Sequence, residues 1–314
     1  MTAGTELEPT PSRSTPAGFG AALGAVVVWG LGNALIARAP LNGMAIATYR
    51  LWLGAALYLA ILYGSGRRLT LDSFRYGWPG GVAFAADICS FFLAVKHTTL
   101  ADATTIGALQ PLLILFVAGS MFGEKVNRRH IICTVVALAG IVVVVEGSAS
   151  GDGHVTFFGE AMAVLSLFGW VGYFITSKQA RRHLDTLEYM TVIMITGAIV
   201  VTPLAAFTGQ LSGHSGRLSW EGFGWIAQVV TLPGSGHILV NWAHNHTTIT
   251  TTSLLTLLMP VISAAAGVWW LDQHIDGLQA LGIAIVLAAL VFVILGDTRA
   301  AVIERDSLEQ QPHG

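Results

Sequence analysis

The sequence predicts an all-α integral membrane protein with ten transmembrane helices, built as two inverted five-helix repeats. Composition, apolar runs of spanning length and an internal repeat predict this class. Of the 314 residues, 54% are hydrophobic and 11% are charged, and the mean hydropathy is +0.66. Soluble proteins carry about 25% charged residues, so this chain has too few charges to cover a water-facing surface. Its composition suits a bilayer and excludes a sizeable soluble domain.

Ten apolar runs each have roughly the 20-residue length that a transmembrane helix needs. Polar or flexible breaks separate them, such as residues 64–68 and 123–129, and a Gly/Ser-rich stretch joins the two halves of the chain. The expected spans are residues 18–37, 44–63, 78–96, 100–121, 131–147, 157–177, 188–208, 221–242, 250–270 and 278–296.

These spans divide the chain into five parts. We expect a cytoplasmic N-terminal tail (1–17), a first repeat (18–147), an outer linker (148–156), a second repeat (157–296) and a cytoplasmic C-terminal tail (297–314). The N-terminal tail is acidic and rich in Pro, Ser and Thr, whereas a cleavable signal peptide begins with a basic region. We therefore expect the first span to remain in the mature protein.

The second half repeats the first at an offset of 149 residues. His97-Thr98-Thr99 recurs as His246-Thr247-Thr248, Pro111 as Pro260, and Gly147 as Gly296. A second offset of 141 pairs Trp29 with Trp170 in the first two spans of each copy. Because each copy has an odd number of spans, the two copies insert with opposite orientations. Inverted repeats around a central site are typical of secondary transporters.

The placement of basic residues predicts the orientation. With the N-terminus in the cytoplasm, the cytoplasmic segments carry most of the Lys and Arg residues, as the positive-inside rule requires. One missed or added helix would destroy this asymmetry, so we expect ten spans with both termini on the cytoplasmic side of the plasma (inner) membrane. The cytoplasmic set is Arg13, Arg67, Arg68, Arg75, Lys125, Arg128, Arg129, Lys178, Arg181, Arg182, Arg299 and Arg305, and the outer set is Arg38, Lys96 and Arg217.

Several short motifs occur together in the first copy. They are the run HTTLADATT at 97–105, Gln110-Pro111, Gly123-Glu124 and Ala139-Gly140-Ile141, with Arg50 in the second span. In this combination the chain, over about residues 18–296, resembles the EamA family of the drug/metabolite transporter superfamily. The second copy has Asp272-Gln273 where the family often has Gly-Glu. The resemblance implies a ten-helix inverted-repeat carrier, often an exporter of amino acids or other small metabolites.

Two titratable residues lie deep in predicted spans. Asp87 is at the midpoint of the third span, where a carboxylate costs about 2.5–3.5 kcal/mol, so it should face a cavity or a partner. The 149 offset maps Asp87 onto Gly236, next to His237 in the eighth span. Both are candidates for the substrate or proton pathway, since carboxyl and imidazole groups carry protons. The alternatives are a carboxyl that bonds a neighbouring helix and a core histidine that bonds a carbonyl.

Arg50 lies in the second span near its outer end. Its guanidinium group could bind a substrate carboxylate through two hydrogen bonds. It could instead pair with Asp87, or extend to the membrane interface.

Prolines near the middle of spans are candidates for hinges. Pro111 and Pro260 lie near the centres of the fourth and ninth spans, and Pro233-Gly234 lies in the eighth. Proline removes one backbone hydrogen bond and kinks a helix. Related kinks would let two helices bend in alternation and so gate a site, and fixed structural kinks are the alternative. The weakened helix at Pro233-Gly234 would also expose backbone groups to a cavity.

Five further residues are candidates for lining a substrate pocket: Trp29, Asn33, Gln110, Trp170 and Tyr173. Trp29 and Asn33 are four residues apart, so they share one helix face. Helix packing or an interfacial aromatic belt is the alternative for the aromatic members.

No metal, cofactor or disulfide is expected. His244 and His246 lie in a predicted cytoplasmic turn, whereas His97 lies on the opposite face, and no nearby Cys or carboxylate completes a ligand set. The sequence lacks the P-loop pattern for nucleotides. Its two cysteines, Cys89 and Cys133, lie in apolar runs. Gly140 and Gly282 allow close helix contact, either inside the chain or at a homodimer face.

These observations favour a secondary transporter that moves a small polar, amino-acid-like metabolite by alternating access. The family resemblance favours export, and Asp87 or His237 would carry a coupled proton. The expected partners are the small-molecule substrate and the lipid bilayer, with a homodimer left open and no nucleic acid. A non-transporting membrane receptor or scaffold is the alternative. A membrane-embedded enzyme is a further one, but it would need several convergent acids, bases or metal ligands.

Overall fold

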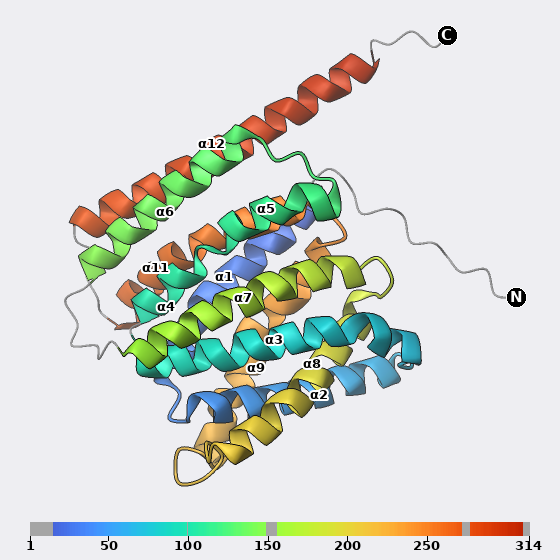
Figure 1. Ribbon diagram of the computed structural model, residues 1–314, viewed down its shortest axis with the longest axis vertical. Helices are drawn as coiled ribbons and strands as arrows, with labels where there is room; N and C mark the ends of the chain where they lie inside the picture. Colours follow the sequence, from blue (N-terminus) through green and yellow to red (C-terminus); the bar gives the residue numbers. More distant parts are fainter. Residues whose placement is uncertain (1–14, 99, 149–155, 272–276, 310–314) are drawn as a thin grey trace, which may run out of the picture.

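The computed structural model describes residues 15–98, 100–148, 156–271 and 277–309. Every regular element in these ranges is helical (Figure 1). The elements are α1 (Pro16–Arg38), α2 (Gly43–Gly64), α3 (Leu71–His97), α4 (Leu100–Gly107), α5 (Gln110–Phe122), α6 (Arg128–Ser148), α7 (Phe157–Ala180), α8 (Thr186–Phe207), α9 (Trp220–Ala243), α10 (Ile249–Leu255), the 3₁₀ turn η1 (Thr256–Leu258), α11 (Met259–Leu271) and α12 (Gly277–Glu309).

The helices have the length and composition of membrane spans. Within the described residues, eight helical segments are long and apolar enough to cross a bilayer, and Ile249–Ser263 forms a shorter apolar segment. Side chains cap the helix ends that reach the polar zones: Thr15, Thr156 and Ser219 each accept a hydrogen bond from the first turn of α1, α7 and α9. The chain is therefore a multi-pass, all-helical membrane protein.

The predicted fourth and ninth helices are not continuous. The predicted fourth helix is broken between α4 and α5 at Ala108-Leu109. The predicted ninth helix passes through η1 between α10 and α11. Each break directly precedes a proline, Pro111 in α5 and Pro260 in α11. A proline ring clashes with the carbonyl four residues earlier and offers no N–H, so the regular helix ends there and a new one begins.

Two predicted ends also differ from the structure. The third helix begins at Leu71 rather than residue 78, because Thr70 and Ser73 form a reciprocal capping box. The last helix continues to Glu309, so the expected C-terminal tail is helical over most of its length. Asp272-Gln273, most of the expected linker 148–156 and residues 1–14 lie outside the described residues.

The helices pack in four long pairs. α3 packs along α7, α1 along α9, α2 along α8, and α6 along α12. The α6–α12 pair forms one edge of the bundle (Figure 1), where Ala137 and Ile141 pack with Val286 and Leu290 in a separate apolar cluster. Gly140 belongs to this contact, since a Cβ there would lie 3.0 Å from the Gly282 carbonyl oxygen. These two glycines therefore serve packing inside the chain.

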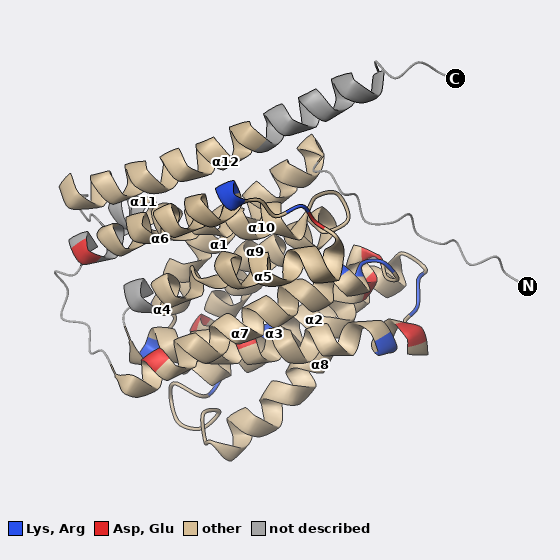
Figure 2. Ribbon diagram, turned by 45° about the horizontal axis from the view of Figure 1, so that its top comes forward, with Lys and Arg blue, Asp and Glu red and all other residues tan. Residues whose placement is uncertain are grey.

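Loop contacts define two ends of the bundle. We call one the basic end: it holds the start of α1, the α2–α3, α5–α6 and α7–α8 loops and the turn after α9. The basic residues there are Arg67, Arg68, Lys125, Arg128, Arg181 and Arg182. At the opposite end the α1–α2 loop contacts the α8–α9 loop, where Asn42 donates to the Ser215 carbonyl at 2.8 Å and to the Gln210 carbonyl at 3.1 Å. Charged residues gather at both ends, and the middle of the bundle is nearly uncharged (Figure 2).

Each end of the bundle has a hydrogen bond from a threonine at a helix start to a histidine carbonyl. At the basic end the Thr15 hydroxyl donates to the His246 carbonyl at 3.0 Å, and at the opposite end the Thr156 hydroxyl donates to the His97 carbonyl at 2.6 Å. Thr15 and Thr156 are 141 residues apart, and His97 and His246 are 149 apart. Next to each threonine a glycine, Gly18 or Gly159, lies so close that a Cβ would be 2.5 or 2.6 Å from the same carbonyl oxygen.

We expect Gly18→Ala and Gly159→Ala each to destabilise the protein by about 1–3 kcal/mol, because the added methyl group forces two helices apart. Gly20→Ala is the matched control in α1, since nothing lies within 4 Å of a Cβ at that position. Thermal melting of the detergent-solubilised variants measures the effect. Equal melting temperatures for all three variants would contradict the two close contacts.

Candidate substrate site

A small cavity lies at the centre of the bundle. Its volume is about 30 Å³, which holds one or two water molecules. Six helices supply its walls: Trp29, Asn33 and Ile36 from α1, Arg50 from α2, Asp87, Ile88, Phe91 and Phe92 from α3, Trp170 from α7, Pro233 and His237 from α9, and Met259 from α11. Seven of the residues predicted for the pathway or its hinges therefore meet at one place.

Arg50 supplies the positive charge of this cavity. Its side chain is 2% exposed, and its guanidinium carbon lies 5.7 Å from the ring centroid of Phe84 and 5.6 Å from that of Phe92. These cation–π contacts stabilise the charge but satisfy no N–H group. Within the described residues, the Arg50 Nε and Nη2 atoms have no hydrogen-bond partner. The guanidinium is therefore held in place with donors left for a ligand.

Asp87 supplies the acidic group of this cavity. Its Oδ1 accepts a hydrogen bond from the Ser166 hydroxyl of α7 at 2.7 Å. The helices can approach this closely because Gly169 faces the Asp87 backbone, where a Cβ would be 2.5 Å from the amide nitrogen. No ion pair within 4.0 Å joins Asp87 to Arg50, although both residues are described. The two charges thus face the cavity from separate supports.

Aromatic rings fill the space between the two charges. Trp29 lies edge-on to Trp170, with ring centroids 5.1 Å apart, and its centroid is 5.0 Å from that of His237. The indole nitrogens of both tryptophans and the Asn33 amide nitrogen are buried without a hydrogen-bond partner among the described residues. A buried unpaired donor costs about 1–3 kcal/mol, so these N–H groups favour a ligand with acceptor oxygens.

Tyr173 and Gln110 lie outside the cavity wall. The Tyr173 hydroxyl lies behind His237, 3.3 Å from its Nδ1. Gln110 lies at the α4–α5 break, where its Oε1 accepts from the Thr256 hydroxyl of η1 at 3.2 Å. Gln110 therefore links the two broken helices and is not part of the pocket lining.

Sequence reasoning missed the residues that hold the site in place. The Asn241 amide nitrogen donates to the Tyr173 hydroxyl at 2.5 Å and to the His237 carbonyl at 2.7 Å. Its Oδ1 accepts a hydrogen bond from the Ser177 hydroxyl. Asn241 follows His237 by four residues, so their common helix face was a detectable signal. Ser166 gave no such signal, because its partner Asp87 is 79 residues away.

A buried ion pair closes the basic end beneath the site. Lys178, at the end of α7, lies 3.6 Å from Glu124 in the α5–α6 loop, and their side chains are 1% and 6% exposed. Lys178 also donates to the Thr247 carbonyl at 2.6 Å. Glu124 accepts from the backbone N–H groups of Ile249 and Thr250 at 2.7 and 2.9 Å. Three separate segments are thereby tied together at this end: the end of α7, the α5–α6 loop and the stretch from Thr247 to Thr250.

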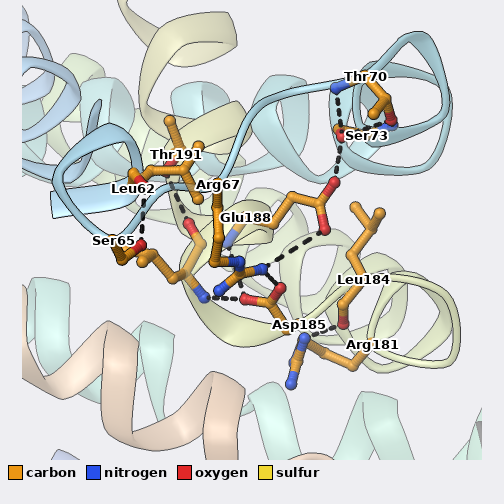
Figure 3. Close-up of polar contacts among 11 residues, drawn as sticks. Leu62, Ser65, Arg67, Thr70, Ser73, Arg181, Leu184, Asp185, Glu188 and Thr191 are labelled. Carbon is orange, nitrogen blue, oxygen red and sulfur yellow. Dashed lines mark hydrogen bonds and ion pairs between the residues drawn. The ribbon is translucent and has the colours of Figure 1, made fainter. Parts of the chain in front are cut away.

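A second, exposed cluster joins the α2–α3 and α7–α8 loops at the same end (Figure 3). Arg67 forms an ion pair with Asp185, which caps α8, and approaches Glu188 to 4.0 Å. Glu188 in turn accepts from Ser73 at the start of α3. The Arg67 and Asp185 side chains are about two-fifths exposed, so this pair is screened by solvent and contributes little stability.

His244 lies next to the buried ion pair, just beyond the end of α9. Burial, and then the charges of Lys178 and Arg181, lower the pKa of His244 well below its usual value. Its Nδ1 lies 2.7 Å from the Ser177 hydroxyl. Burial also lowers the pKa of Arg181 to about 10, which leaves the guanidinium charged at neutral pH. His244 is therefore a neutral packing residue.

Comparison with known proteins identifies the family. The family model described as "EamA-like transporter family" matches the chain twice, over residues 16–146 and 157–295. This chain belongs to the EamA-like transporter family. It is a membrane transporter, in agreement with the resemblance seen in its motifs.

Several relatives of this EamA-like transporter have names that state a function. It is 24% identical over 288 residues to a probable amino-acid metabolite efflux pump of Escherichia coli (strain K12), which covers 88% of this chain and 94% of the relative. It is 22% identical over 262 residues to the pseudopaline exporter CntI of Pseudomonas aeruginosa (strain UCBPP-PA14), covering 82% and 89%. The aromatic amino acid exporter YddG of Ancylobacter novellus is 27% identical over 130 residues, which cover 40% of this chain and 45% of the relative.

A solved crystal structure has the same fold. It superposes with a TM-score of 0.72 over 91% of this chain and 99% of that chain, at 19% sequence identity. A likeness at this identity shows the fold alone.

The buried neutral His244 predicts how stability of this transporter depends on pH. An unfolded histidine takes up a proton below about pH 6.5, whereas folded His244 does not. We therefore expect the contribution of His244 to stability to be constant above pH 6.5 and to fall by up to about 1.4 kcal/mol per pH unit below it. His244→Asn keeps a partner for Ser177 without a titrating ring, so its melting temperature should fall less between pH 6.5 and 5. Parallel curves for both proteins would contradict a neutral His244.

Proposed function

We propose that this protein is a secondary transporter that exports a small amino-acid-like metabolite across the plasma membrane by alternating access. One observation carries this proposal: a central cavity that holds a guanidinium with unpaired donors and a separate carboxylate. An amino acid offers the complementary pair of groups. Once the helices move apart and enlarge the cavity, its carboxylate would bind Arg50, its ammonium group would lie near Asp87, and its side chain would pack against Trp29 and Trp170. The relatives named as exporters of amino acids and of pseudopaline support the direction and the substrate class.

Alternating access requires two halves of opposite orientation, and we propose that residues 18–147 and 157–296 are such inverted repeats. The reciprocal contacts Thr15–His246 and Thr156–His97 support this, since they follow both sequence offsets and lie at opposite ends. The packing of α1 along α9 and of α7 along α3 also supports it, because the two sequence offsets relate α1 to α7 and α3 to α9.

We propose ten spans with the basic end in the cytoplasm. The apolar segment Ile249–Ser263 and α6, which packs along the spanning helix α12, would complete the set. Orientation is supported by the basic loops, which the positive-inside rule places in the cytoplasm. Both chain termini would then be cytoplasmic.

Proton coupling would use a group that faces the cavity, and Asp87 and His237 are the two candidates in its wall. We propose that one of them binds a proton in exchange for the substrate. An exchange rate independent of pH would contradict this part of the proposal.

We expect Arg50→Gln to reduce exchange of radiolabelled phenylalanine, threonine or cysteine in proteoliposomes by at least about tenfold, because it removes a charged hydrogen bond to the carboxylate. Arg50→Lys keeps the charge and should retain part of the rate. Arg68→Gln, in an exposed loop, is the control. Phenethylamine, which lacks the carboxylate of phenylalanine, should be a poor substrate, and its equal transport would contradict the role of Arg50.

The Glu124–Lys178 pair would close the cytoplasmic side in this mechanism. We expect Glu124→Gln to destabilise the protein by about 3–5 kcal/mol, because it leaves a buried ammonium group without its counter-charge. The double variant Glu124→Gln/Lys178→Met removes both charges and should recover part of that loss. Thermal melting measures both, and a double variant less stable than Glu124→Gln alone would contradict the pair.

A further inference from the structure

A second and much larger cavity lies between α1 and α9. Its volume is about 350 Å³, which falls in the range of small-molecule sites. Residues from the half of each helix nearer the opposite end line it: Ala34, Leu35 and Arg38 from α1, and Trp225, Gln228, Thr231 and Leu232 from α9. We call this space the α1–α9 groove. It differs from the central cavity, which has room only for water.

The groove carries three polar side chains, Arg38, Gln228 and Thr231, where a lipid-facing helix surface is normally apolar. Gln228 and Thr231 are exposed on α9, and each side chain bonds its own helix, to the Gly224 carbonyl at 3.2 Å and the Ala227 carbonyl at 2.8 Å. Arg38 is exposed at the end of α1 and forms no ion pair with any described residue. A positive, partly polar wall of this kind favours an anion over a lipid tail alone.

The groove and the central cavity share one wall. Asn33 faces the cavity and Ala34 the groove, and on α9 Pro233 faces the cavity and Leu232 the groove. At this wall the helices touch through Gly32, where a Cβ would be 2.6 Å from the Pro233 Cβ. Pro233 lies inside α9 and removes one of its backbone hydrogen bonds. Bending of α9 at Pro233 would therefore join the two spaces.

We propose that the α1–α9 groove is the exit vestibule, a second anion-binding site in which Arg38 receives the substrate carboxylate after it leaves Arg50. This inference rests on the proposed transport function. The shared wall favours the substrate as occupant over a phospholipid, because Ala34 and Leu232 of the groove directly adjoin Asn33 and Pro233 of the cavity. The path opens toward the opposite end of the bundle, away from the Glu124–Lys178 closure.

Accessibility of a single cysteine tests the groove without requiring transport. In a Cys89→Ala/Cys133→Ala background, Thr231→Cys should react with water-soluble methanethiosulfonates, both an anionic sulfonate and a cationic ammonium reagent. Ile238→Cys, exposed elsewhere on α9, is the control and should stay unreactive in lipid. Arg38→Gln should lower the ratio of anionic to cationic labelling rates by about fivefold, and Arg217→Gln, on the same side but outside the groove, should leave it unchanged.

Transport then tests the path. In proteoliposomes that exchange phenylalanine, anionic labelling of Thr231→Cys should abolish exchange, and phenylalanine should slow the labelling. The anion site is overturned if Thr231→Cys is unreactive, or if Arg38→Gln leaves the ratio of anionic to cationic labelling rates unchanged. Full exchange after labelling overturns the exit path. An Arg38 effect confined to vesicles that contain phosphatidylglycerol identifies a lipid site and also overturns it. Charge-selective labelling in a protein that exchanges no amino acid would support the anion site and refute the proposed transport function instead.

Discussion

The structure depends on holding an acidic and a basic side chain, Asp87 and Arg50, in the middle of an apolar bundle without a direct ion pair between them. Removing a charge from water costs several kcal/mol unless partners replace the water. Arg50 obtains partners from the faces of Phe84 and Phe92, and Asp87 obtains one from Ser166. Each support comes from a tight helix crossing, and the one at Asp87 exists only because Gly169 has no side chain. A substrate with both charges can then bridge them.

The two ends of the bundle are closed by different chemistry. At the basic end Lys178 reaches the carbonyl groups after α9 and also pairs with Glu124. At the opposite end Lys96 reaches the Ala37 and Ala39 carbonyl oxygens, with no carboxylate in ion-pair range among the described residues. The sequence position equivalent to Glu124 is Gln273. The bundle is therefore closed by a buried ion pair at the basic end and by hydrogen bonds from Lys96 to carbonyl oxygens at the other.

Much of this arrangement was predictable, because a bilayer allows only a few solutions for the backbone. Hydropathy located the helices, and the repeat of His97 at His246 marked the positions that later proved to face Thr156 and Thr15. The offset from Asp87 to Gly236 also drew attention to His237, which lies in the cavity wall. Contacts made by single side chains across long sequence distances were not predictable. Gln110 is a residue type common in polar pockets, but the α4–α5 break puts it outside the cavity wall. The contacts of Phe84 and Phe92 with Arg50, and of Ser166 with Asp87, follow no sequence periodicity.

The difference between the two closures also indicates which side opens more easily. Opening the basic end would separate Lys178 from Glu124 and free the backbone groups that both residues bind, so two buried charges would need new partners. Opening the opposite end would break hydrogen bonds, such as the 2.8 Å hydrogen bond from Tyr49 to the Gly216 carbonyl and those from Lys96 to two carbonyl oxygens, but no ion pair among the described residues. Pro233 already lacks a backbone hydrogen bond inside α9. In the proposed alternating-access cycle, the state open at the opposite end would therefore cost less to reach, and the large α1–α9 groove lies on that side.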